Sequence, residues 1–250
     1  MTEVTTTRAD LVRFRFRRHQ LDRPPGTARS KLPDMVDYGV QDTGPDGAAW
    51  ALAIRGAAPG VVGLDLAWTL RGAPHAYRRS DLRAVAVATA PYDRSDAAKR
   101  IFDASKPLVG AGIDVIDALR TIAEEQRSIV TKPLVKGEVS SRLAKRVGDP
   151  YLRFCRPCNA THVYENPFRL AALQAGLVLE WGTSPPVMRR VPRLRPALYG
   201  TLAVDADRRF DVIRNHLRFY PGARYRDVAS FLDAPIKVVK DRWPDDAVEV

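Results

Sequence analysis

The stretch from residue 37 to residue 79 constrains the fold more than any other part of the chain. It holds a tight polar turn, Gln41 to Gly47, whose glycine, proline and aspartate adopt backbone angles that other residues resist. A short apolar helix is predicted at Ala48 to Ile54, followed by strand-like runs at Val61 to Leu70 and His75 to Arg78. Because a short RGAP segment separates these runs, they predict a β-hairpin.

The charge balance of the chain points to nucleic acid as the first partner to consider. Forty Lys plus Arg stand against 29 Asp plus Glu, which leaves a formal net charge of +11. Such an excess attracts phosphate backbones from a distance. Two alternatives stay open, because a GC-rich genome enriches arginine without purpose and many basic proteins bind no nucleic acid.

The sequence lacks the signals of a membrane or secreted protein. No apolar run approaches the ~18 residues that a membrane span needs, and the amino terminus lacks the apolar core of a secretory signal. Two cysteines are too few for a secreted disulfide framework. These observations predict a cytoplasmic protein that binds no membrane, and we expect a monomer. Phosphate-loop, zinc-protease and serine-elbow motifs are also missing from the sequence.

Helical patterns cover most of the remaining chain. Ala9 to Gln20 fits a helix with Leu11, Phe14 and Leu21 inward, or a strand, and the helix is favoured because the run precedes a Pro-Pro-Gly break. Further helices are predicted over Leu32 to Val40, from a Ser80-Asp81 cap through Leu82 to Thr89, over Pro107 to Ala123, Gly137 to Ala144 and Phe168 to Ala175, with a strand at Leu177 to Trp181, and then over Arg208 to Phe219, Tyr225 to Leu232 and Ala234 to Asp241.

The order of these elements predicts a mainly α protein with short β-hairpins, of the α+β class. A helix that leads into a polar turn and a basic-rimmed hairpin is typical of a winged helix. The pattern recurs in outline, so we expect tandem winged helix-turn-helix units at 8–90, 91–200 and 205–250, the last of them incomplete.

Two segments of the chain resemble a known family. The run Tyr38 to Thr43 with Ala48 to Arg55, and the run Leu66 to His75, resemble the opening of the tandem winged-helix DNA-binding family that includes the AlkZ/YcaQ-type bacterial DNA glycosylases. The run Phe210 to Asp233 is similar to the family's third helix-turn-helix unit. The resemblance implies three winged helices around a basic channel that binds double-stranded DNA. In the family's enzymes, it implies hydrolysis of the bond between an alkylated or crosslinked base and its sugar.

The resemblance also implies roles for particular residues. The family pattern is Gln-x-Gln or Gln-x-Asp, and its first glutamine matches Gln41, which would hold a water beside the damaged nucleotide. The second position is Thr43, with Asp42 between, and this departs from both patterns. A neutral amide orients water but is a poor base, so the departure leaves two hypotheses. The chain is a DNA glycosylase that uses Gln41, Asp42 and Thr43, or a non-catalytic DNA-binding module such as a transcriptional regulator.

Each candidate residue also has a structural explanation. Gln41, Asp42 and Thr43 could cap the helix that follows, and His75 could be a hydrogen-bonded residue at the hairpin end. Trp68 fits a core position as well as a base-stacking one, and the arginines near the hairpin fit an ordinary solvated rim. The residues expected to contact DNA are Arg55, Arg71, His75, Arg78, Arg79 and Arg169.

A Cys-x-x-Cys-x-x-x-His cluster lies in the second predicted unit. Cys155, Cys158 and His162 could supply three ligands to zinc, but a fourth ligand is missing nearby. The alternative is a pair of reduced cysteines in a cytoplasmic protein. We therefore expect no cofactor, with zinc as the alternative.

Overall fold

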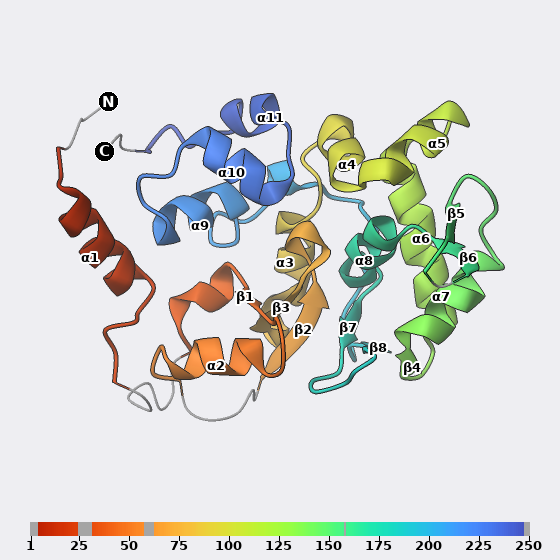
Figure 1. The fold of residues 1–250 in the computed structure, drawn as a ribbon, viewed down its shortest axis with the longest axis horizontal. Coiled ribbons are helices and arrows are strands. Elements are labelled where there is room, and N and C mark those ends of the chain that lie inside the picture. The colour runs from red at the N-terminus through yellow and green to blue at the C-terminus, as the bar shows by residue number, and fades with distance from the viewer. Residues whose placement is uncertain (1–4, 25–31, 58–62, 158, 248–250) are drawn as a thin grey trace.

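The computed structural model describes residues 5–24, 32–57, 63–157 and 159–247. It is a mixed structure, 47% helical and 13% strand, which agrees with the predicted α+β class. Helices surround strands that join near the middle of the molecule (Figure 1). None of the described helices is both long enough and apolar enough to cross a membrane.

The chain begins with α1 (Arg8–Arg18), so the helical alternative for this segment is confirmed. Its start is fixed by the Thr7 hydroxyl, which accepts a hydrogen bond from the Asp10 amide. The expected inward position of Phe14 is wrong, because this side chain is 45% exposed. Leu11 and Leu21 are half-buried, so α1 docks on the molecule through a narrow contact.

The predicted helix at Leu32 to Val40 is also wrong. The segment forms one 3-10 turn, Asp34–Asp37, and then the short strand β1 (Val40–Gln41). Gly39 separates them with φ = +101°, a left-handed conformation that ends the turn. The chain passes so close to Tyr77 here that a Cβ on Gly39 would lie 2.4 Å from the tyrosine hydroxyl oxygen.

The predicted helix and hairpin after the polar turn are confirmed. Helix α2 is Gly47–Ala53, and the hairpin pairs β2 (Leu64–Trp68) with β3 (Pro74–Arg78) antiparallel around a 3-10 turn, Leu70–Gly72. Strand β2 is shorter than the predicted run, and Val61 and Val62 lie outside the described residues. All five residues of β2 are buried, which is expected of a central strand.

Helices α3 (Leu82–Ala88) and α4 (Arg94–Arg100) follow the hairpin. The predicted cap of α3 is wrong, because neither Ser80 nor Asp81 accepts a hydrogen bond from its first turn. The Asp81 carboxylate instead pairs with Arg78 and Arg209.

The predicted continuous helix at Pro107 to Ala123 is divided. The structure has α5 (Ser105–Gly110) and α6 (Val115–Ile129), with Gly112 at φ = +74° between them. Asp114 caps α6 by accepting hydrogen bonds from the amides of residues 116 and 117. Ile116, Leu119 and Ile122 of α6 face the core. Ile113 lies in the connection before α6 and is partly buried, so the apolar spacing continues across the break.

The middle of the chain contains two predicted helices and several strands that were not predicted. Helices α7 (Lys136–Ala144) and α8 (Glu165–Gln174) lie close to their predicted positions. Between them is a separate two-stranded hairpin, β5 (Leu152–Cys155) with β6 (Ala160–Val163). Strand β7 (Leu177–Leu179) was predicted, whereas β4 (Leu134–Val135) and β8 (Val187–Arg190) were not.

The three carboxy-terminal helices were predicted. They are α9 (Val212–Phe219), α10 (Tyr225–Leu232) and α11 (Ile236–Lys240). Asp233, at φ = +54°, joins α10 to α11 at the predicted position. Their buried side chains, among them Phe219, Val228 and Val239, belong to the same apolar core as the hairpin.

A single antiparallel sheet connects the first and second predicted units. Its strand order is β1-β3-β2-β7-β8-β4, and β2 meets β7 where Leu66 faces Leu179. The main apolar cluster extends from Met35 to Val239 and includes residues of all three predicted units. The unit boundaries at 8–90, 91–200 and 205–250 stay a prediction, and the apolar cluster shows that these segments share one core.

We expect Gly39→Ala to lower the free energy of unfolding by about 3 kcal/mol. The added Cβ costs about 1–2 kcal/mol at positive φ, and displacing the Tyr77 hydroxyl from its hydrogen bond to Thr69 adds a similar amount. Urea denaturation measures the loss.

Gly44→Ala is the matched control, because Gly44 has φ = +74° and a Cβ added there would meet no atom within 4 Å. It should lose only about 1 kcal/mol. Equal losses in the two variants would show that contact with Tyr77 does not matter.

Candidate functional site

A small cavity lies beside the ladder between β1 and β3. The register places Gln41 directly opposite His75. The cavity has a volume of about 160 Å³, and its lining comes from β1, the 3-10 turn, β3 and helix α10: Gln41, Leu70, Arg71, Ala73, His75 and Phe231. Two predicted site residues from β1 and β3 thus meet at one hollow, and a side chain from a distant helix closes it.

Hydrogen bonds fix the ring of His75. Its Nδ1 lies 3.0 Å from the Ala73 carbonyl oxygen and 3.1 Å from the Thr69 hydroxyl. Because a carbonyl only accepts, Nδ1 carries the hydrogen and the neutral ring has its lone pair on Nε2. The Thr69 hydroxyl is held in turn by the Tyr77 hydroxyl at 2.9 Å. The hydrogen bonds of the hairpin therefore satisfy Nδ1 of His75, as the structural explanation expects. Its Nε2 can still accept a hydrogen bond.

Burial keeps His75 neutral. The residue is 4% exposed, and removal from water lowers its pKa to about 4, against a smaller opposite effect of the Ala73 hydrogen bond. His216 has a pKa of about 4 for the same main reason. At neutral pH the cavity therefore meets an uncharged imidazole.

The polar turn holds its three candidate residues in different ways. The Gln41 side chain is exposed, and its Nε2 donates to the Thr43 hydroxyl at 2.7 Å. Asp42 Oδ1 accepts from the Ala48 amide at 2.9 Å, so this carboxylate caps the start of α2. The helix-cap explanation is confirmed for Asp42. The side-chain carbonyl oxygen of Gln41 is left to accept a hydrogen bond from a ligand or water.

Arg71 lies at the cavity in an unusual backbone conformation. It has φ = +59° and ψ = +21°, the left-handed region that non-glycine residues seldom adopt. Its side chain is 55% exposed, and Nε lies 3.5 Å from the carboxylate of Asp233. Such strained positions are found often at functional sites, and the DNA contact of Arg71 stays a prediction.

Two of the predicted DNA-contacting arginines are turned toward the protein. Arg55 is 8% exposed and donates to the Ala51 carbonyl oxygen, so its side chain is turned inward, and its contact with DNA stays a prediction. Arg169 reaches from α8 to the hairpin, where it donates to the Gly72 carbonyl oxygen at 3.2 Å. Its guanidinium lies over the ring of Trp68, which is 3% exposed and so occupies a core position.

The remaining predicted arginines, Arg78 and Arg79, take part in ion pairs. Arg78 pairs with Asp37 at 2.5 Å and lies 3.6 Å from Asp81. Arg79 forms an ion pair with the fully buried carboxylate of Asp65, although its own side chain is 54% exposed. Of these two arginines, Arg79 keeps the more accessible guanidinium.

The proposed metal ligands lie on the β5–β6 hairpin. Cys155 is on β5 and His162 is on β6, where Nδ1 lies 2.9 Å from the Val163 carbonyl oxygen. Cys158 lies outside the described residues. Within the described ranges, no group of three or more His, Cys, Asp or Glu side chains could hold a metal ion. Zinc binding by this cluster stays a prediction.

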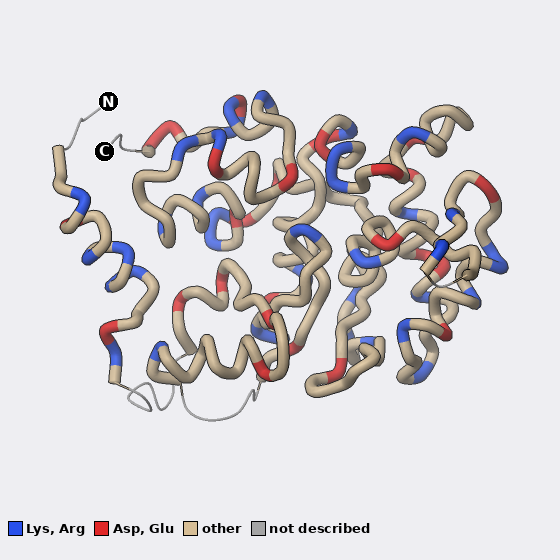
Figure 2. Tube along the Cα trace, viewed as in Figure 1, with Lys and Arg blue, Asp and Glu red and all other residues tan. Residues whose placement is uncertain are grey.

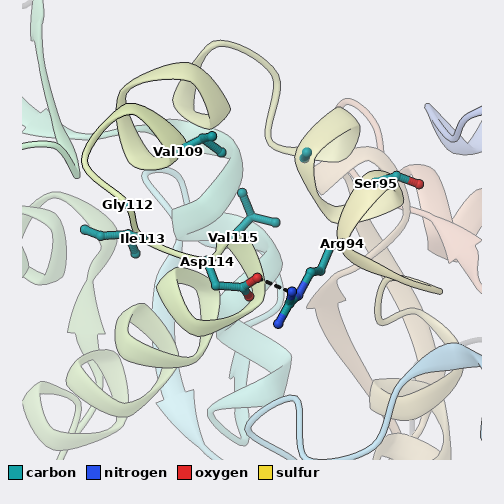
Figure 3. Close-up of a pocket in the computed structure, with 8 residues that line it drawn as sticks. Arg94, Ser95, Val109, Gly112, Ile113, Asp114 and Val115 are labelled. Atoms are coloured by element: carbon teal, nitrogen blue, oxygen red, sulfur yellow. Dashed lines mark ion pairs between the residues drawn. The ribbon is translucent and has the colours of Figure 1, made fainter.

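A larger cavity lies elsewhere and contains none of the predicted site residues. It has a volume of about 520 Å³ and lies between α4 and the start of α6 (Figure 3). Its lining is largely apolar, with an ion pair of 2.7 Å between Arg94 and Asp114 at the edge. The smaller cavity combines a neutral imidazole, an amide and an arginine, which is the richer set of groups for chemistry.

Sequence reasoning missed Phe231, which lines the smaller cavity, and the residues that hold its other lining side chains in place. Phe231 and Asp233 come from the far end of the chain, and no local pattern connects them to the hairpin. Thr69 and Tyr77 had a weak signal. Tyr77 stands two residues after His75 on β3, so the two side chains share one face of the strand, and Thr69 lies just before the turn and bonds to both.

Comparisons with known proteins support one assignment. The family model "DNA glycosylase AlkZ-like" matches residues 63–250. Among solved structures, the Streptomyces sahachiroi DNA glycosylase AlkZ is similar, with a TM-score of 0.61 and 16% sequence identity over 95% of this chain. The matched part is 64% of that longer chain. A search of curated proteins finds no match.

We expect the stability of the protein to fall as the pH drops from about 6.5 to about 4. An unfolded histidine protonates near pH 6.5, whereas folded His75 and His216 protonate only near pH 4. The unfolded state therefore takes up protons first in this window, which costs about 1.4 kcal/mol for each pKa unit. Above pH 6.5 the penalty disappears.

His75→Asn tests the contribution of one ring. Urea denaturation gives the free energy of unfolding at pH 7 and at pH 4.5. The decrease between the two pH values should be about 2 kcal/mol smaller in this variant than in the unchanged protein. His162→Asn, on the partly exposed β5–β6 hairpin, is the control and should leave the loss nearly unchanged. An identical loss in all three proteins would contradict the assignment to His75.

Proposed function

This chain belongs to the AlkZ-like DNA glycosylase family, and from that premise we propose that it binds duplex DNA and releases alkylated bases from it. The observation that carries the proposal is the juxtaposition of Gln41 and His75 at the cavity. The family model includes His75 but begins after Gln41. The place of Gln41 at the site is therefore supported by its position opposite His75.

The reaction needs little from the protein beyond positioning. An N7-alkylated purine carries a positive charge and leaves without a general acid, so the enzyme has to place a water and support a cationic sugar. The side-chain carbonyl oxygen of Gln41 and the His75 Nε2 lone pair are two acceptors that can hold such a water. The cavity volume of about 160 Å³ exceeds the ~10–15 Å³ that one water needs.

Arg71 gives the cavity a contact for phosphate. Its exposed guanidinium lies at the opening, partly neutralised by Asp233. An arginine there would hold the backbone next to the reacting sugar and fix its position relative to Gln41. Arg79 extends the basic surface on the other end of β3, beside the buried carboxylate that orients it.

We also propose that the middle of the chain is a winged helix-turn-helix. Helices α6, α7 and α8 are followed by the β7–β8 hairpin, and β4 pairs with β8 at its edge. This is the order of helices, short strand and wing in that motif. The first and last thirds of the chain would supply the other two units of the array.

A binding function without catalysis is the second candidate, and one observation favours it. The Asp42 carboxylate caps α2, and Thr43 occupies the position where the family pattern has glutamine or aspartate. Among the described residues that line the cavity, none carries a carboxylate. The variants below distinguish the two candidates.

We expect Gln41→Ala to abolish base release while duplex affinity changes less than twofold. Duplex DNA with N7-alkylated purines is incubated with protein, and abasic sites are then cleaved with alkali.

Asp42→Asn should keep activity and stability, because its amide oxygen can still accept from the Ala48 amide. Thr43→Gln restores the family pattern and should raise the rate of release, by about tenfold if it adds one hydrogen bond to the water.

Different results would assign the protein differently. Loss of release in Asp42→Asn with intact folding would make that carboxylate the catalytic group. No release by the unchanged protein or by Thr43→Gln, together with tight DNA binding, would select the non-catalytic candidate.

We expect Arg71→Gln to weaken binding to any duplex and to reduce the salt dependence. One lost phosphate contact lowers the slope of log affinity against log salt by about 0.9. Arg94→Gln is the control, because it also removes one exposed, ion-paired arginine but lies at the larger cavity. Equal slopes for Arg71→Gln and Arg94→Gln would remove Arg71 from the interface.

A further inference from the structure

Helix α1 exposes an unusual set of side chains. None of its 11 residues is buried, and it carries three large apolar side chains that are exposed: Val12 at 56%, Phe14 at 45% and Phe16 at 48%. Single exposed apolar residues need no explanation, but three on one short helix indicate a surface that meets a partner.

The orientation of α1 is fixed from one side. Arg15 donates through Nε and Nη2 to the Pro221 carbonyl oxygen at 3.0 and 2.8 Å, and His19 Nε2 lies 2.8 Å from the Phe219 carbonyl oxygen. Leu11 packs beside Gly222. Leu11, Arg15 and His19 are spaced by four residues and so form one stripe of the helix. The opposite face is therefore turned away from α9.

The outward face is strongly cationic. The helix contains five arginines and one aspartate, and Figure 2 shows basic positions along its whole length. Arg13 is 72% exposed and pairs with the exposed Asp10 carboxylate at 3.0 Å, while Arg17 and Arg18 are also exposed. At 100° per residue, Arg13 and Arg17 lie between Val12 and Phe16 on one side and Phe14 on the other.

This arrangement fits DNA better than a membrane surface. A helix that lies in a membrane interface presents one continuous apolar face, whereas arginines here separate the apolar residues into two flanks. A DNA backbone offers charged phosphates beside less polar sugar faces, which matches a cationic stripe with apolar flanks. The helix is about 16 Å long, enough to meet several phosphates.

We propose that α1 is a second DNA-contacting element, separate from the Gln41 cavity. Arg13 and Arg17 contact phosphates, and Val12 and Phe16 pack against the neighbouring sugars. The proposal rests on the proposed DNA binding and adds a contact outside residues 63–250, the part that the family model matches.

The first experiment removes the charge. Affinity for a 25-base-pair duplex is measured by fluorescence anisotropy from 50 to 300 mM salt. The double variant Arg13→Gln, Arg17→Gln should bind about tenfold more weakly near physiological salt, with a salt slope smaller by nearly two. Arg94→Gln, Lys106→Gln on α4 and α5 is the control with the same change in charge, because it lies outside the proposed winged helices, and its slope should change by less than half as much.

The second experiment removes the apolar flank. Val12→Ser, Phe16→Ser alters only exposed side chains, so folding should be unchanged by circular dichroism. We expect weaker binding with an unchanged salt slope, because no phosphate contact is lost.

The outcomes separate the proposals. If the unchanged protein does not bind DNA, the proposed function and this inference both fail. If it binds and both α1 variants keep full affinity, only the inference fails. Two further results would overturn the inference if the serine variant keeps its DNA affinity. In the first, the unchanged protein binds anionic vesicles and the serine variant does not. In the second, sedimentation shows that the unchanged protein is a dimer and the serine variant is a monomer.

Discussion

The pairing of β2 with both β3 and β7 is the interaction on which the rest of the structure depends. Strand β2 is buried along its whole length, and through it the amino-terminal hairpin and the β7–β8 hairpin become one sheet. Its one charged residue, Asp65, is fully buried and is neutralised by Arg79 and Arg189. A buried carboxylate without these partners would be costly, so the two arginines are part of the strand's stability before they are part of any surface.

The candidate cavity follows from this sheet. Once β3 is fixed against β2, Thr69 before the turn and Tyr77 on β3 lie beside His75, and β1 adds Gln41 at the edge. The same burial that holds the imidazole also lowers its pKa to about 4 and keeps its Nε2 free of a proton. Structural and chemical explanations of His75 are therefore compatible, since different nitrogens of one ring serve them.

Local signals in the sequence predicted most of the helices and the β2–β3 hairpin, but little of the pairing between segments that are distant in the sequence. The helix α2, the β2–β3 hairpin and the last three helices follow from periodicity and turn residues, which act over a few positions. The errors have a physical cause as well. Residues 32–40 look helical until Gly39 has to pass against Tyr77, and apolar spacing continues across the break before α6 because Ile113 still packs near the core. Very short strands such as β4 exist only through their partners, so their sequences carry no signal of their own.

The candidate site shows the same division. The family resemblance implied Gln41 as a site residue, Arg71 and His75 were predicted on the hairpin, and all three line one cavity. Arg55 could not be distinguished from them, because an arginine after a short helix is expected to be exposed, and only the structure shows that it is buried. Phe231 lines the cavity and Asp233 pairs with Arg71, and both come from a distant part of the chain. A function that requires them therefore depends on docking of the carboxy-terminal helices, and any change that loosens α10 should act on the site through Phe231 and Arg71, without touching the motif residues.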